Sequence, residues 1–120
     1  MTRVIRDSDQ VEIQTAFGAN VAGSYGTFTA SDTTPSVAEG NIFETGSAVT
    51  ITNFDDGVVG QIITVISRHD VIYDVAGTNL KAGTTNITTA SGDVTNWVYN
   101  GTDWFLINFM DVSANLSSGH

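Results

Sequence analysis

The sequence predicts an all-β fold, an antiparallel β-sandwich or jelly roll of about eight short strands with an extended N-terminal arm. The chain is rich in Thr, Gly and Asn, and charged residues make up only 14% of it. Such a composition disfavours helices and favours strands joined by tight turns. Nowhere do apolar residues recur with helical spacing, whereas short apolar runs recur between turn signals, about every 8–12 residues.

The chain has 120 residues, the usual size of one domain. We expect an N-terminal docking arm over residues 1–34, a β domain over residues 35–112 and a loose tail over residues 113–120. The first boundary follows the turn signal that ends at Pro35. Cysteine is absent, which excludes disulfides and thiolate metal sites. Neither a secretory signal nor a membrane-spanning run is expected, because no apolar segment is long enough.

Charge is distributed unevenly along the chain, whose formal net charge is −9. Two of its four basic residues, Arg3 and Arg6, lie at the N-terminus. From Asp7 onward only Arg68 and Lys81 oppose all 13 acids, so that part carries 2 − 13 = −11. A surface this acidic repels phosphate backbones, and we therefore expect no nucleic-acid partner.

The apolar runs place the expected strands. In chain order these are residues 11–14, 20–29, 41–44, 48–54, 61–67, 71–75, 94–99 and 104–107. Gln61–Ser67 is the most apolar run, and we expect a central strand covered on both faces. Leu80 and Ile87 are isolated anchors in a Gly/Thr/Asn-rich stretch.

Asn100-Gly101 between aromatic runs predicts a hairpin with both residues at positive φ. The expected core and hairpin residues are Phe43, Phe54, Ile63, Val65, Trp97, Tyr99, Asn100, Gly101 and Trp104.

Residues that could carry chemistry have simpler structural interpretations. His69 lies at a polar corner beside Asp70, where neighbouring side chains diverge, and we favour an exposed corner residue over a catalytic or metal-binding one. His120 receives no role. Asp55-Asp56-Gly57 lacks the spacing of an EF-hand loop and favours a turn. The aromatic residues of the hairpin favour a core over a sugar-stacking platform.

No nucleophile elbow, phosphate-binding loop or dinucleotide fingerprint occurs in the sequence. Thirteen acids always allow some carboxylate pair, so a glycosidase pair is an unspecific signal. We therefore expect no enzymatic activity, no cofactor and no metal.

Six short motifs follow one another between residues 35 and 104: Pro35-Ser36-Val37, Gly40–Thr45, Ile51–Phe54, Asp56-Gly57, Gly60–Val65 and Tyr99–Trp104. Their order resembles the small β domain at the C-termini of phage tailspikes, tail fibres and related virion proteins. The resemblance covers about 70 of the 120 residues. It implies a jelly-roll sandwich that forms homotrimers on a virion and supplies no catalytic residues.

A short arm precedes the module in place of a long fibre body, which favours a capsid decoration (cement) protein on the head shell. Its expected partners are its own copies and the major capsid protein or another virion protein. Arg3 and Arg6 could pair with acidic patches on the shell, and Val11 and Ile13 could add a strand to a neighbour's sheet. A frayed, solvated terminus is the alternative for this arm.

Three other functions stay open. The first is a short tail fibre or tailspike component that attaches to the host. The second and third, of lower weight, are a small glycan hydrolase and a carbohydrate-binding module of a bacterial surface protein.

Overall fold

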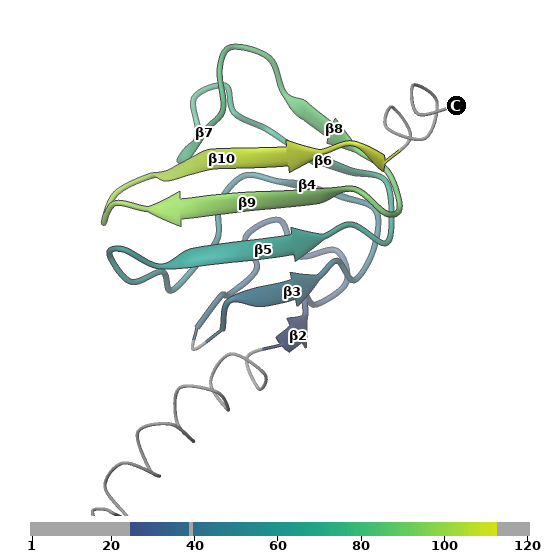
Figure 1. Ribbon diagram of the computed structural model, residues 1–120, viewed down its shortest axis with the longest axis horizontal. Helices are drawn as coiled ribbons and strands as arrows, with labels where there is room; N and C mark the ends of the chain where they lie inside the picture. The colour runs from purple at the N-terminus through teal and green to yellow at the C-terminus, as the bar shows by residue number, and fades with distance from the viewer. Residues whose placement is uncertain (1–24, 39, 113–120) are drawn as a thin grey trace, which may run out of the picture.

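Two β-sheets packed over one core make up the part of the chain that the computed structural model describes, residues 25–38 and 40–112 (Figure 1). One sheet has six strands in the order β2-β3-β5-β9-β10-β7, and the other has three in the order β4-β6-β8. The strands are Tyr25–Thr27 (β2), Ile42–Glu44 (β3), Val49–Ile51 (β4), Ile62–Ile66 (β5), Val71–Tyr73 (β6), Leu80–Lys81 (β7), Ile87–Thr89 (β8), Val94–Tyr99 (β9) and Trp104–Met110 (β10). No helix occurs among these elements, so the all-β, sandwich-like prediction is confirmed.

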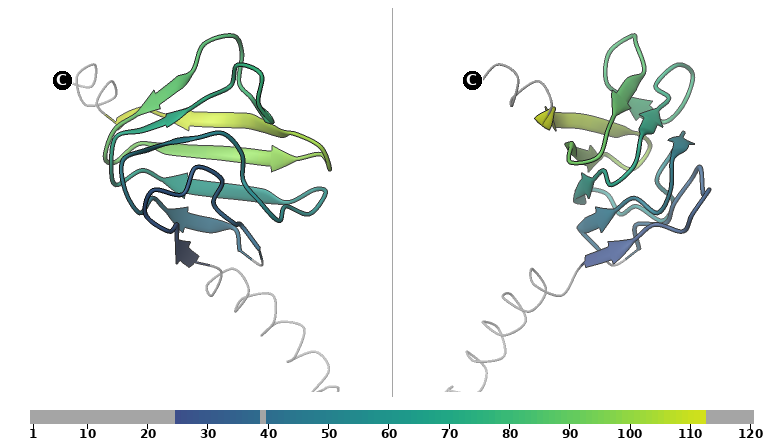
Figure 2. Two further views of the ribbon diagram at one scale, coloured as in Figure 1. Left: turned by 180° about the vertical axis from the view of Figure 1, so that it is seen from behind. Right: turned by 90° about the vertical axis from the view of Figure 1, so that its right-hand side faces the viewer.

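Both sheets are mixed, and the prediction of antiparallel sheets was therefore wrong. β3 pairs in parallel with β2 and β5, β4 with β6, and β7 with β10. Antiparallel pairing is limited to β5 with β9, β9 with β10, and β6 with β8. From β3 to β6 the chain alternates between the two layers, as Figure 2 shows, so that successive strands of one sheet run in the same direction. Turn signals cannot predict this, because they do not say which sheet the next strand joins.

The β domain includes residues that the sequence analysis placed in the arm. β2 pairs with β3 along its whole length, and the next residue, Phe28, donates its N–H to the carbonyl of Glu44 at 2.9 Å. The ring of Phe28 is buried, 5.1 Å from that of Phe43 between centroids. The domain therefore extends to Tyr25 at least.

An aromatic cluster forms the centre of the core. Phe54 lies 5.6 Å from Trp97 and 5.4 Å from Trp104 between ring centroids, both edge-on. Both indoles are fully buried and both donate their N–H, Trp97 to Thr95 Oγ1 at 2.9 Å and Trp104 to the carbonyl of Phe54 at 3.1 Å. These rings are therefore unavailable for stacking on a sugar. The residues expected in the core that are buried are Phe43, Phe54, Ile63, Val65, Trp97 and Trp104, while Tyr99 is half-buried.

The hairpin between β9 and β10 has a four-residue loop. Asn100 Oδ1 accepts the N–H groups of Thr102 and Asp103 at 2.9 and 2.8 Å, and Asn100 N–H donates to the carbonyl of Asp103. Gly101 has a φ of +102°, whereas Asn100 is outside the left-handed region. Asn100 therefore closes the loop with its side chain, and only Gly101 needs the conformational freedom that was predicted for both residues.

Tyr73 places a hydroxyl group inside the core. Its side chain is fully buried, and its Oη lies near the hydroxyls of Thr95 and Ser67 without reaching hydrogen-bond geometry. Those two hydroxyls bond elsewhere, to Trp97 and Thr89 respectively. Because burial disfavours the phenolate, it raises the pKa of Tyr73 to about 12.

This raised pKa predicts a loss of stability at alkaline pH that Tyr73→Phe removes. Below pH 10.0, the ordinary pKa of the group, the folded and unfolded chains both keep the proton. Above it the unfolded chain releases the proton first, so the free energy of unfolding falls by up to about 1.4 kcal/mol per pH unit until the folded pKa is passed. Urea titrations between pH 9 and 11.5 should show a shallower fall for Tyr73→Phe. The exposed Tyr25→Phe should keep the parent slope, and equal slopes in all three proteins would contradict the prediction.

Candidate assembly surface

Side chains that point away from the core form one broad surface of the six-stranded sheet. The strand register arranges them in rows across the strands. The first row is Ile62, Val98 and Phe105; the second is Tyr25, Ile42, Thr64, Asn96 and Asn108; the third is Thr27, Glu44, Ile66, Val94 and Met110. We call this surface the outer face.

Large apolar side chains on the outer face are open to solvent. Ile62 is 54% exposed and Phe105 is 40% exposed, and Ile107, the extra residue of the bulge in β10, is 54% exposed. In β5 only Ile63 and Val65 face the core. The expectation that residues 61–67 are covered on both faces was therefore wrong. The described residues cover one face of β5 and leave the other apolar and uncovered.

The outer face is comparable in size to functional apolar patches. Its six strands hold 26 residues, which at about 3.3 Å per residue and about 4.8 Å between strands give roughly 400 Å² of projected area. The largest apolar patch of a typical monomer is about 300–600 Å² and is often functional. A stable protein–protein interface takes roughly 800 Å² from each partner. The outer face therefore supplies about half of the area that one stable contact needs, and surrounding side chains must supply the rest.

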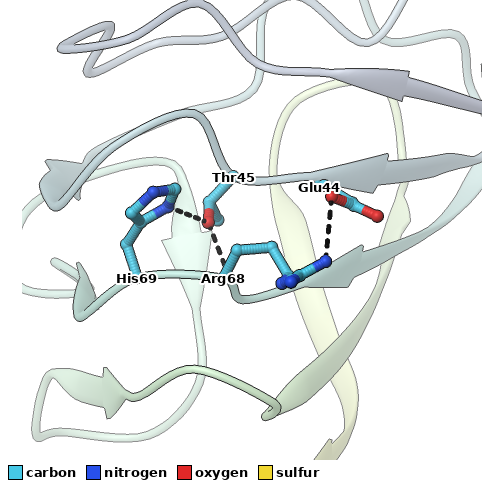
Figure 3. Close-up of polar contacts among 4 residues, drawn as sticks. All are labelled: Glu44, Thr45, Arg68 and His69. Carbon is cyan, nitrogen blue, oxygen red and sulfur yellow. Dashed lines mark hydrogen bonds and ion pairs between the residues drawn. The ribbon is translucent and has the colours of Figure 1, made fainter.

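Charges of the described residues lie mostly outside this surface. Those residues include nine acids and two bases, so they carry 2 − 9 = −7. Glu44 is the one acid among them that lies in a strand, and it forms an ion pair with Arg68 at 3.5 Å (Figure 3). Lys81 lies at the opposite edge, beside Phe105 in the register. The other acids are in loops, so a neutral apolar sheet face belongs to a strongly acidic body.

A row of polar side chains crosses the middle of the outer face. Asn96 donates Nδ2–H to Thr64 Oγ1 at 2.7 Å, and Asn108 donates Nδ2–H to Asn96 Oδ1 at 3.3 Å. We call these three residues the polar row. Because its members already bond to one another, covering them costs less than covering unpaired polar groups.

An apolar turn precedes β5. Val58 and Val59 are 66% and 68% exposed. Their turn is closed by Gln61, which donates its N–H to the carbonyl of Val58 at 2.8 Å and accepts the Val58 N–H on Oε1 at 3.0 Å. Gly60 takes a φ of +88° within this turn, a conformation that suits glycine. The two valines are therefore presented to solvent in a held conformation.

His69 connects the corner between β5 and β6 to the end of β3 (Figure 3). The buried Thr45 accepts the N–H of Arg68 on Oγ1 at 2.9 Å, and the same oxygen lies 3.0 Å from His69 Nδ1. The direction of the Thr45–His69 hydrogen bond depends on the tautomer of the imidazole. The imidazole is half-buried, not exposed as predicted, and its contacts hold the corner in place.

Acidic residues elsewhere also have structural partners. Asp93, in an open depression beside β8, is buried and accepts the N–H groups of Ala90 and Val112, each at 2.9 Å. Asp56 has a φ of +68° and accepts the hydroxyl of Ser36 at 2.6 Å, as expected for a turn. Within residues 25–38 and 40–112, no group of three or more His, Cys, Asp or Glu side chains is placed to hold a metal ion.

Several sequence-based expectations concern residues outside the described ranges. Arg3, Arg6, Val11 and Ile13 of the docking arm lie there, and so does His120. An apolar outer flank covered by other copies was expected from the sequence, but its residues were not identified. Its only signal was apolar residues at successive positions, and this signal was attributed to burial on both sides of one strand.

The fold and this surface together define a class, an all-β sandwich-like module with a neutral apolar sheet face that its described residues leave uncovered. No known family model matches the chain, and no curated protein matches it. Among the described residues, no helix is long and apolar enough to cross a membrane.

Proposed function

We propose that this chain is a virion structural protein, a homotrimeric decoration protein that docks on a capsid and stabilises the head shell. The outer face is the observation that supports the proposal. An apolar sheet face of this size promotes uncontrolled association unless a defined partner covers it. Copies of the same chain are the simplest such partner. The sandwich would then be a jelly-roll variant with mixed sheets.

The proposed function requires contacts between proteins and no catalysed reaction. Three copies related by a three-fold axis use one heterologous interface that closes on itself. One docking contact per copy becomes three contacts per trimer, so avidity raises the affinity for the shell. A trimer that binds only assembled shell subunits stabilises the assembled state by mass action. The acidic loops keep a protein of high copy number soluble.

Purified particles test the location. Quantitative mass spectrometry and antibody-labelled electron microscopy should find hundreds of copies per particle, spread over the head. A handful of copies at the tail tip would overturn the decoration function, and absence from the particles would overturn the virion assignment. Sedimentation equilibrium of the purified protein should give three times the chain mass of 12.7 kDa.

Attachment to the host as a tail fibre or tailspike component is a second candidate. Tyr25 is 51% exposed in the same row as Thr64, Asn96 and Asn108. Aromatic rings beside amide and hydroxyl groups are suited to sugar recognition, although the polar row already bonds within itself. A glycan array and an adsorption-blocking assay with the isolated protein decide this candidate. Binding that Tyr25→Ala abolishes would favour it over shell decoration, and absence of binding in both assays would remove it.

A further inference from the structure

We propose that the polar row Thr64–Asn96–Asn108 sets the register and the number of copies when the outer faces of three copies pack around a common axis. The inference rests on the proposed function, because it assumes that copies of the chain cover one another. It adds a role for three residues that are too polar for the centre of an apolar face. The occupant to which we commit is a second copy of the chain.

The charge of the outer face suits a neutral partner better than a strongly basic one. The described residues carry −7, yet the outer face is neutral between the Glu44–Arg68 pair at one edge and Lys81 at the other. A strongly basic partner would be drawn to the acidic loops instead of this face. A neutral apolar surface fits another neutral apolar surface, and the chain itself provides one of matching size.

The polar row is also complementary to itself. In the two bonds along the row, Asn96 uses one N–H and one oxygen, and Asn108 uses one N–H. Each amide therefore keeps a second N–H, the oxygen of Asn108 keeps its acceptor sites, and Thr64 keeps its hydroxyl hydrogen. Donors and acceptors remain together, so the same row on a second copy can supply partners for both.

Apolar contacts alone would leave the packing of two outer faces poorly defined, because hydrophobic attraction is not directional. Ile62, Val98 and Phe105 lie on one side of the polar row, and Ile66, Val94 and Met110 lie on the other. A slipped or rotated copy would place these apolar side chains against Asn96 and Asn108 and leave their remaining polar groups dehydrated without partners. A buried asparagine fixes register and copy number in coiled coils for the same reason, at a cost in stability.

Asn96→Val tests the inference in the full-length chain, since valine suits a strand and removes the amide at the centre of the row. Native mass spectrometry and sedimentation velocity should show that the variant still associates, at least as tightly as the parent. The parent's single defined mass should be replaced by a distribution over several masses. Thr88→Val, which adds a valine on the exposed side of β8, is the matched control and should keep the single mass.

Two results in the variant would overturn the inference. An unchanged single mass would show that the row has no part in defining the assembly. A monomeric variant from an associated parent would show that the row supplies affinity instead of register. A parent that is itself monomeric would overturn the proposed function and this inference with it. Asn108→Val, at an exposed position, gives the same readout if Asn96→Val lowers the yield of folded protein.

Discussion

Replacing Ile62 with lysine will separate the copies of this chain without unfolding them. Ile62 is 54% exposed in the described chain, so the monomer can carry a lysine there with little strain. In an assembly that covers the outer face, the same ammonium group would be buried without a partner, at a cost of several kcal/mol. We expect the dissociation constant to rise by at least about 100-fold, as measured by sedimentation equilibrium over a dilution series.

The matched control is Ile72→Lys. Ile72 is also exposed but lies on β6 of the three-stranded sheet. Both variants have the same composition and change the net charge from −9 by the same single unit. Repulsion between copies therefore falls equally in both and cannot explain a difference between them. Equal association of Ile62→Lys and Ile72→Lys would contradict the role of the outer face.

Trp104→Ala will remove a large part of the stability of the fold. Trp104 is fully buried, stacks on Tyr99 at 4.7 Å between ring centroids and bonds to the carbonyl of Phe54. Trp104 is also the register partner of Leu80, where β10 pairs with β7. Truncating a buried tryptophan to alanine costs about 3–5 kcal/mol, against a total of about 5–15 kcal/mol for a domain. Urea unfolding followed by the fluorescence of Trp97 measures the loss.

A smaller substitution at the same position separates the stability that packing contributes from the stability that the hydrogen bond contributes. Trp104→Phe keeps most of the ring volume but leaves the carbonyl of Phe54 without its donor, so it should cost about 1–3 kcal/mol. Val59→Ala, at a residue that is 68% exposed, should change the free energy of unfolding by less than about 0.5 kcal/mol. A cost for Trp104→Ala no larger than that for Val59→Ala would contradict the central place of this tryptophan.

The strands could be predicted from the sequence where apolar residues are dense. β9 and β10 lie on the aromatic runs that flank Asn100-Gly101, and β5 lies within Gln61–Ser67. β7 and β8 were missed because each is short and built around one apolar anchor, Leu80 or Ile87, in a stretch of Gly, Thr and Asn. Their place in the sheets depends on partners far away in the sequence.

The parallel pairings and the residues of the outer face could not be predicted, for two different reasons. Pairing of β3 with β5 depends on β4 joining the other sheet, and no local turn signal records that choice. Ile62 and Ile63 look alike in the sequence, yet one is exposed and the other is buried. Hydrophobicity reports that a side chain avoids water. It does not report whether its own domain or a second molecule covers it.

The central claim, that other copies of the chain cover the outer face, can be tested by measuring thiol reactivity. The chain has no cysteine of its own, so Ile62→Cys and Ile72→Cys each introduce one thiol at an exposed strand residue, one in each sheet. At concentrations where the chain associates, we expect a maleimide to modify position 62 at least about tenfold more slowly than position 72, and the two rates should converge on dilution. Equal rates at every concentration would contradict the account.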